Sequence, residues 1–411
     1  MTALVRDTLR QRADYTHKFN LCTGRHGWLR LTPAYSVKVV EELIGAVDGP
    51  LQVLDPFCGT ATTGLSAAYH GHMATTTDIN SFLVWLGLVK TDYYSLATCA
   101  AVRHACTRAL NLVKREAVDP APVPPIHNIE RWWSDHALAF LRLLRSAIEA
   151  VTASGTKEKN LLQVSFCRSL IRLSNAAFNH QSMSFRDDRQ MALDLDDMAA
   201  LFRKDVSFVI DGAAENPTGA CSVIQADSRD LPKHLDEKFD LVITSPPYAN
   251  RMSYIRELRP YMYWLGYLMN GRDAADLDWG SIGGTWGVAT SRLMEWIPTR
   301  EGYNSRELTD ALHGIACDEN ANGRLLSNYV AKYFEDMWAH LTHLRGVLAP
   351  GARVHYFIGN STFYGVLLPT EKIYADMLSA LGFAGINIRP VRKRNSKKEL
   401  IEFDVSASFK G

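Results

Sequence analysis

The sequence predicts an α/β protein with a doubly wound, mostly parallel sheet that ends in an antiparallel hairpin. Three observations support this fold class. Residues 51–78 have the pattern strand, loop, helix, strand, which is the β-α-β unit of parallel sheets. Two short apolar runs return at 221–227 and 239–245, after a long helical stretch. Near the carboxyl end, 384–392 and 400–409 are expected to pair as the hairpin.

A helical insertion follows the β-α-β unit. The apolar run 51–55 ends in a loop rich in glycine and threonine, and 62–71 has helical spacing. A strand at 72–78 and a helix at 81–90 come next. Residues 95–215 then have the spacing of amphipathic helices, interrupted by the stiff segment DPAPVPP. We therefore expect a helical insertion between the second and third strands.

The second half of the chain completes the sheet around an irregular region. A helix is expected at 254–268, whereas 270–322 is rich in Gly, Trp and Asp, lacks clear periodicity and is expected to be irregular. The spacing at 325–348 predicts a helix that stops at the Pro350–Gly351 turn. A strand and a further helix within 352–383 precede the hairpin.

Composition limits the class of protein. The 411 residues can bury a large core, so disorder is not the default expectation. Lys and Arg number 45 against 44 Asp and Glu, a net charge of +1, so any nucleic-acid surface must be a local patch. The seven cysteines are scattered, and their odd number argues against a disulfide framework. The charged amino terminus lacks the apolar core of a signal peptide, and no 18-residue apolar run occurs, so we expect a soluble cytoplasmic protein.

The first chemically informative segment is DPFCGTATTG, at Asp55–Gly64. It lies where a strand ends and a helix begins. Small residues there let the backbone approach a ligand, because ligands of open α/β sheets bind outside the strand ends. An ordinary tight turn is the alternative, whereas a Walker phosphate loop is excluded because no Gly-Lys-Ser/Thr follows.

Two aspartates end the neighbouring strands. Asp78 follows the glycine loop at the spacing from which a carboxylate accepts hydrogen bonds from both ribose hydroxyls. Asp227 ends the third strand and can accept a hydrogen bond from an adenine amino group. Either aspartate can instead cap the next helix, and Ser228 and Asp230 compete locally with Asp227 for that cap.

The most specific element is Thr244-Ser-Pro-Pro-Tyr248, directly after a strand. Two successive prolines remove backbone donors and fix φ, which leaves the preceding carbonyls rigid and available, and Tyr248 offers a flat aromatic face. Such acceptors suit an amino group whose nitrogen must become tetrahedral. The Ser245 oxygen and the Pro246 carbonyl can each accept an N–H bond and align the nitrogen for direct, in-line methyl transfer. The alternative is a plain turn.

DPFCGTATTG together with TSPPY resembles motifs I and IV of the DNA amino-methyltransferases, and the serine form of the second motif is typical of the N4-cytosine group. The segment HGWLRLTPAYSVKVVEELI is similar to motif X of that family, Asp78 to motif II and Asp227 to motif III. The resemblance implies a class I S-adenosylmethionine-dependent methyltransferase fold, a Rossmann-like mixed sheet with a terminal antiparallel hairpin, here with a helical insertion. It also implies S-adenosylmethionine as cofactor, S-adenosylhomocysteine as product and a target base rotated out of the DNA duplex.

The resemblance assigns roles to single residues. Asp55, Phe57 and Gly59 correspond to the methionine end of the cofactor, Asp78 to its ribose and Asp227 to its adenine. The residues expected to bind the cofactor are Thr32, Pro33, Asp55, Pro56, Phe57, Gly59, Thr60, Thr62, Thr63, Asp78, Asp227 and Ser228. The residues expected to act on the base are Ser245, Pro246, Pro247 and Tyr248. We expect no metal, because no His/Cys/Asp cluster has ligand spacing and the reaction requires none.

Two features depart from the family pattern. Ala61 stands where the family usually has a second glycine, which affects the shape of the cofactor loop. The helical insertion falls between motifs II and III, an unusual position, so the order of motifs does not assign the chain to one of the standard permuted classes.

Three polar segments are candidates for contacts with DNA. Residues 174–189 combine amide, aromatic and arginine groups, three arginines (Arg251, Arg256 and Arg259) follow TSPPY, and 389–398 is the densest cationic run. The alternatives are a polar helix end, ion pairs with acids such as Glu257, and a solvated face. The candidate nucleic-acid residues are His180, Gln181, Arg186, Arg251, Arg256, Arg392, Lys393 and Arg394.

The sequence thus predicts a site-specific DNA methyltransferase that modifies N4 of cytosine in double-stranded DNA, associated with a restriction or defence system. Adenine N6 methylation, an RNA base amino-methyltransferase and a non-catalytic binding module are the alternatives. We expect a cofactor half at 1–94, the insertion at 95–215 as possible target recognition, a catalytic half at 216–269, an irregular region at 270–324 as possible DNA contact, and completion of the sheet at 325–411.

Overall fold

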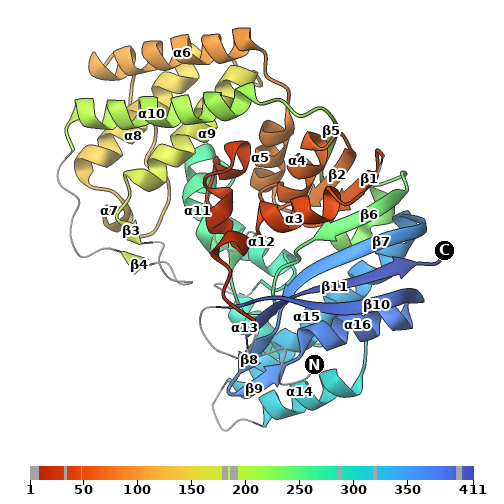
Figure 1. Ribbon diagram of the computed structural model, residues 1–411. Coiled ribbons are helices and arrows are strands. Elements are labelled where there is room, and N and C mark those ends of the chain that lie inside the picture. Colours follow the sequence, from red (N-terminus) through yellow and green to blue (C-terminus); the bar gives the residue numbers. More distant parts are fainter. Residues whose placement is uncertain are drawn as a thin grey trace.

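A seven-stranded mixed sheet forms the centre of the computed structural model (Figure 1). The structure describes residues 9–31, 35–47, 49–177, 184–185, 193–284, 289–317, 322–394 and 400–411. The strands of the sheet are β1 (Gln52–Asp55), β2 (Met73–Asp78), β5 (Ala220–Gln225), β6 (Phe239–Thr244), β7 (Leu348–Gly359), β10 (Phe383–Lys393) and β11 (Ile401–Phe409).

The strand order is β10-β11-β7-β6-β1-β2-β5. The neighbours from β7 to β5 are parallel, whereas β11 lies antiparallel between β7 and β10. A parallel sheet with an antiparallel terminal hairpin is the class I methyltransferase architecture that the sequence predicted. The fold prediction is therefore confirmed.

Helices cover both faces of the sheet because successive strand residues point to opposite sides. On one face, α3 (Val37–Ile44) packs with Val53 of β1 and Leu241 of β6. On the other face, α15 (Gly323–Leu344) and α16 (Thr370–Ala380) pack with Leu54 and Val242. The helices α4 (Thr62–Tyr69) and α5 (Ser81–Thr91) complete the β-α-β unit, as expected.

The insertion is helical, as predicted, and forms a separate bundle beside the sheet (Figure 1). Its elements are α6 (Leu96–Lys114), α7 (Ile129–Trp132), α8 (Asp135–Val151), α9 (Lys157–Arg172), a two-stranded ribbon of β3 (Ala176–Ala177) and β4 (Ser184–Phe185), and α10 (Leu195–Ala214). The helix after the TSPPY loop, α11 (Tyr254–Leu265), joins the core of this bundle: Trp264 packs edge-on against Trp133 and Phe166.

The expectation of an irregular region at 270–324 is wrong for much of that segment. It contains α12 (Gly271–Gly280), α13 (Ala289–Glu295) and α14 (Arg306–Ala316). The α14 residues Leu308, Ala311 and Ile315 are buried at helical spacing, so periodicity could have revealed that helix. Hydrophobic periodicity does not reveal α12, which has few apolar residues. Local capping does: the Asn270 side chain and Asp273 form a reciprocal capping box at the start of α12.

The remaining elements are short, and one predicted boundary shifts. The helix expected at 325–348 ends at Leu344, and β7 already begins at Leu348, so Pro350 and Gly351 lie at the irregular start of that strand. The short elements are η1 (Ala13–Tyr15), α2 (His17–Asn20), η2 (Gly24–Gly27), η3 (Ser228–Lys233), η4 (Arg345–Val347), β8 (Ser361–Phe363) and β9 (Val366–Leu368).

Within the described residues, no helix has the length and apolarity to cross a membrane, and no group of side chains is arranged to hold a metal ion.

Buried ion pairs attach the insertion to the amino-terminal segment. The Asp205 carboxylate of α10 is fully buried and accepts hydrogen bonds from Arg168 (3.1 Å), Arg172 (2.8 Å) and Ser169 (2.9 Å). Arg168 also donates to the carbonyls of Gly27 and Trp28, both at 2.8 Å. A single carboxylate therefore fixes the arginine that holds the segment next to the sheet.

Asp205→Asn is expected to lower the free energy of unfolding by about 3 kcal/mol, because it leaves two arginines beside an uncharged amide in a buried site. The measurement is urea unfolding followed by circular dichroism. The matched control is Asp196→Asn, which breaks an exposed ion pair with Lys114 and should change stability little. Equal effects of the two substitutions would contradict this assignment.

Candidate active site

One pocket lies at the carboxyl ends of β1, β2, β5 and β6, where ligands of open α/β sheets bind. Its volume is about 970 Å³, including the solvent at its mouth. The predicted residues that line it are Pro56, Phe57, Gly59, Thr60, Thr62, Asp78, Asp227, Ser228, Ser245 and Pro247. The glycine loop, both strand-ending aspartates and the TSPPY loop therefore share one cavity.

Other predicted residues lie behind or beside this pocket. Asp55 and Thr63 are fully buried and are not among the lining residues, and neither are Pro246 and Tyr248. The predicted residues Thr32 and Pro33 lie outside the described residues.

Buried hydrogen bonds join the two loops of the pocket. Thr244 donates to Oδ1 of Asp55 at 2.6 Å, and the Thr63 hydroxyl donates to the Ile243 carbonyl at 2.9 Å. The same Asp55 oxygen accepts the N–H of Phe57 at 3.0 Å. Burial raises the pKa of Asp55 to about 6. The hydrogen bond between Asp55 and Thr244 thus links the end of β1 to the end of β6, directly before Ser245.

The glycine loop takes a left-handed turn at the position of the unusual alanine. Ala61 has φ +58° and ψ +36° and is fully buried. Glycine adopts this conformation without strain, whereas alanine pays roughly 1–2 kcal/mol. The departure therefore keeps the shape of the loop at a cost in stability. Gly64 meets a different requirement, since a Cβ there would come within 2.7 Å of Thr76 and Cys221 on the sheet.

Asp78 presents a carboxylate to the pocket. Its two oxygens accept the N–H groups of Gly59 (3.0 Å) and Asn80 (2.9 Å). Asp78 therefore shapes the glycine loop and also supports the start of α5, whose cap is Asn80. Burial raises the pKa of Asp78 to about 6, although both backbone hydrogen bonds act in the opposite direction.

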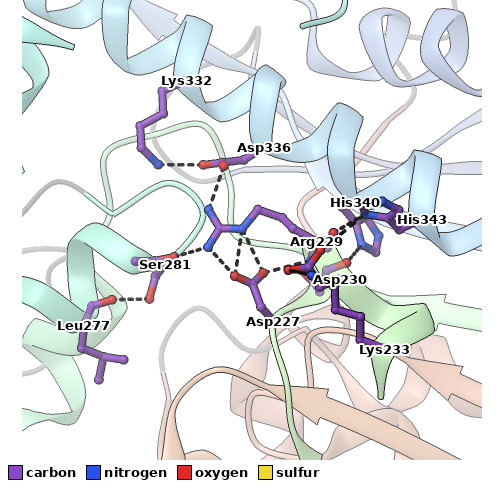
Figure 2. A network of polar contacts seen from close by, with 12 residues as sticks. Asp227, Arg229, Asp230, Lys233, Leu277, Ser281, Lys332, Asp336, His340 and His343 are labelled. Atoms are coloured by element: carbon purple, nitrogen blue, oxygen red, sulfur yellow. Dashed lines mark hydrogen bonds and ion pairs between the residues drawn. The ribbon is translucent and has the colours of Figure 1, made fainter. Parts of the chain in front are cut away.

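Asp227 lines the pocket and is held by an arginine that the sequence did not single out (Figure 2). Arg229 contacts Asp227 at 2.6 Å and Asp336 at 2.7 Å, and it donates to the Gly280 carbonyl at 2.6 Å. Burial alone would raise the pKa of Asp227, but the Arg229 guanidinium outweighs it and lowers that pKa. Asp227 also caps η3, as the alternative interpretation allowed.

A buried lysine beneath the glycine loop was also missed. Lys90 is fully buried at the end of α5, and its Nζ donates to the Thr60 carbonyl at 2.5 Å. Burial lowers its pKa to about 7. A single lysine in the otherwise apolar helix SFLVWLGLVK was the available signal, because a buried amine needs a specific acceptor.

The TSPPY loop places Ser245 in the lining of the pocket. The Ser245 hydroxyl donates its proton to the Phe357 carbonyl of β7 at 3.1 Å. A hydroxyl has a single proton and two lone pairs, so a second partner of this oxygen must be a donor.

The candidate nucleic-acid residues are only partly brought together. Arg394 lies over the Tyr248 ring, with 5.5 Å from Cζ to the ring centroid, whereas Arg392 forms an ion pair with the buried Glu402 at 2.5 Å. Lys393 is the last residue of β10, so this strand extends into the cationic run at 389–398. Arg251 and Arg256 flank the start of α11. His180, Gln181 and Arg186 lie outside the described residues.

Comparison with known proteins points to one chemical class. No protein-family profile matches the chain. Two curated relatives, type II methyltransferase M.BsoBI from Geobacillus stearothermophilus and type II methyltransferase M.AvaI from Nostoc sp., are each 24% identical, over 192 and 177 residues. The chain is similar to methyltransferases. Each match covers 41% of this chain but only 36% of the relative, so it spans little more than a third of those proteins.

Two solved structures also align with the chain. TrmN from Thermus thermophilus and the rRNA methyltransferase aviRa from Streptomyces viridochromogenes cover 96% and 95% of it, and 53% and 92% of their own chains. The identities are 11% and 12%, and both TM-scores are 0.31. The strand order of the sheet, not these alignments, carries the fold assignment.

The chemistry of the pocket fits S-adenosylmethionine, the cofactor that methyltransferases use. Each Asp78 oxygen accepts one backbone N–H, and a carboxylate oxygen can accept a second hydrogen bond, here from a ribose hydroxyl. Leu31, Ile79, Leu83 and Ile282 add apolar surface for a flat base.

The affinity for S-adenosylmethionine is expected to fall about tenfold for each pH unit below 6, because hydroxyl donors bind the ionised Asp78 and its pKa is raised to about 6. Calorimetric titration of the whole chain at pH 7.5 and 5 measures this. Asp55 titrates in the same range but does not line the pocket. Asp78→Asn should therefore bind weakly at both pH values and lose most of the pH dependence. A wild-type affinity equal at both pH values would contradict the role of Asp78.

Proposed function

We propose that this protein is an S-adenosylmethionine-dependent DNA methyltransferase that transfers a methyl group to N4 of cytosine. The observation that carries the proposal is a shared cavity. Asp78 and Gly59, suited to the cofactor, line the same pocket as Ser245 and Pro247, suited to an amino group. Strand tips distant in sequence thus bring a donor site and an acceptor site together.

The acceptor loop favours direct transfer. S-adenosylmethionine supplies an electrophilic methyl carbon on a sulfonium. The Ser245 oxygen, whose proton is donated to Phe357, and the Pro246 carbonyl accept the two N–H bonds of the target amine and draw its nitrogen toward tetrahedral geometry. The N–C bond forms as the C–S bond breaks, and the nitrogen then loses a proton to water. The step needs no covalent enzyme intermediate and no metal.

DNA is proposed as the substrate because the curated relatives are type II methyltransferases and because the acceptor loop has the form TSPPY. The target amine must leave the base stack to reach the pocket, and Tyr248 would stack on the rotated base. We propose that the insertion at 95–215 contributes to target recognition and that 270–324 and the arginines near the loop contact DNA. Association with a restriction system and a cytoplasmic location belong to the same proposal.

Other activities make different demands on the site. Adenine N6 is an exocyclic amine that the same acceptors can hold, so it is the second candidate. An RNA enzyme acting on guanine N2 would be expected to carry Asn in place of Ser245 and an RNA-binding appendage. A non-catalytic binding module would have no need of the acceptor loop.

DNA from a host that expresses the protein is expected to contain N4-methylcytosine. The measurement is nuclease digestion followed by mass spectrometry of the nucleosides, with the Ser245→Ala variant as the control. N6-methyladenine in place of N4-methylcytosine would overturn the choice of base. Absence of both, together with absence of binding heat for S-adenosylmethionine, would favour the binding module.

Ser245→Ala is expected to lower turnover by at least tenfold while cofactor affinity stays within about twofold, because the lost oxygen faces the acceptor and not the cofactor. Steady-state methylation of DNA and calorimetric titration with S-adenosylmethionine measure the two quantities. A variant with intact turnover, or one that loses mainly cofactor affinity, would show that Ser245 has another role.

A further inference from the structure

We propose that two tyrosines of α15, Tyr329 and Tyr333, are positioning residues that orient the TSPPY loop so that the Pro246 carbonyl is the one left for the target amine. The inference rests on the proposed function. Neither tyrosine lines the pocket, and their role follows from the hydrogen bonds that they make to the loop backbone.

The loop cannot hold itself in place by ordinary strand pairing. Pro246 and Pro247 have no N–H group, so the hydrogen bonding of β6 stops at Thr244. The backbone groups left to anchor the loop are its carbonyls and the N–H groups that follow the prolines. The loop itself supplies one such bond, from the N–H of Asn250 to the Tyr248 carbonyl at 2.8 Å. The Pro247 carbonyl needs a partner outside the loop.

Tyrosine hydroxyls provide these partners. Tyr333 donates to the Pro247 carbonyl at 2.8 Å, and Tyr329 donates to the Tyr248 carbonyl at 3.4 Å. Tyr329 also accepts the N–H of Arg251 at 3.1 Å, and the Tyr254 hydroxyl accepts the N–H of Tyr248 at 3.1 Å. Because Tyr333 gives its single proton to Pro247, its 2.7 Å contact with Tyr374 must be a hydrogen bond donated by Tyr374.

The Pro246 carbonyl differs in its hydrogen bonding from the two carbonyls that follow it. Between described residues, no hydrogen bond reaches it, while the next two carbonyls along the chain are both occupied. Tyr329 and Tyr333 are each only 1% exposed, and burial raises the pKa of both phenols, so both hydroxyls remain protonated donors. The loop is thus held at two carbonyls, and the Pro246 carbonyl, beside the pocket-lining Ser245 and Pro247, has no such bond among the described residues.

The same helix face also reaches the cofactor side of the pocket. Asp336 contacts Arg229, which holds Asp227, and His340 lies 2.9 Å from the Ser228 carbonyl (Figure 2). Together with Tyr329 and Tyr333 these residues have spacings of four, three and four, which place them on one side of a helix. The helix α15 therefore contacts both the TSPPY loop and the segment that follows β5.

The test compares Tyr329→Phe, Tyr333→Phe and the double variant with wild type. Each single substitution keeps the ring and is expected to lower kcat about tenfold, and the double variant about a hundredfold, while the affinity for S-adenosylmethionine changes less than about twofold. Hydrogen exchange measured by mass spectrometry should show faster exchange at residues 244–253. Methylation of DNA, cofactor titration and exchange are all measured on the full chain.

Tyr94→Phe is the matched control. Tyr94 is also 1% exposed, and its hydroxyl donates to the Val89 carbonyl at 2.7 Å, far from the loop in sequence. It should cost similar stability and leave both kcat and exchange at 244–253 unchanged. Loss of kcat equal to that of the α15 variants would overturn the proposal, as would unchanged exchange in those variants.

The two proposals fail in different ways. A wild-type protein that methylates no base would refute the proposed function, and exchange at 244–253 would then still decide whether the tyrosines hold the loop. An active wild type with unaltered kcat in the double variant would refute the positioning role and leave the proposed function intact.

Discussion

The hydrogen bond from Thr244 to the buried Asp55 carboxylate is the interaction on which the site depends. It joins the last residues of two adjacent parallel strands, and the glycine loop begins where one ends and the TSPPY loop where the other ends. In a buried site such a bond is strong, and a missing partner would leave a desolvated carboxylate. The spacing between a cofactor and an acceptor is therefore set in the sheet, beneath the groups that would contact either ligand.

Contacts from outside the sheet also hold the glycine loop and the TSPPY loop. Lys90 holds the Thr60 carbonyl from beneath, and α15 holds the opposite side through hydroxyl and carboxylate groups. The buried charges are costly, yet Lys90, Asp55 and Asp78 all have pKa values moved by burial toward neutral pH. This pattern of perturbed groups around one cavity is common at functional sites.

The insertion is not an independent appendage in this structure. Arg25, fully buried, donates to the carbonyls of Gly212 and Ala213 in α10 and to the carbonyl of Lys90. Trp264 of α11 also packs into the hydrophobic core of the bundle. The insertion therefore contacts both the amino-terminal segment that contains Arg25 and the helix α11, which follows the TSPPY loop.

The sequence by itself determined the sheet and the two loops of the site. Strand periodicity, the small residues of DPFCGTATTG and the paired prolines of TSPPY are local signals, because they act on the backbone of neighbouring residues. The helix α12 escaped because few of its residues are apolar and its start depends on a capping box, whereas the apolar spacing of α14 was a usable local signal. Only the tertiary structure decided that Arg229, Lys90, Tyr329 and Tyr333 contact the segments that form the pocket. Lys90, Tyr329 and Tyr333 contact backbone groups far away in the chain, and Arg229 joins its neighbour Asp227 to the distant Asp336. A single sequence contains no record of which distant groups meet.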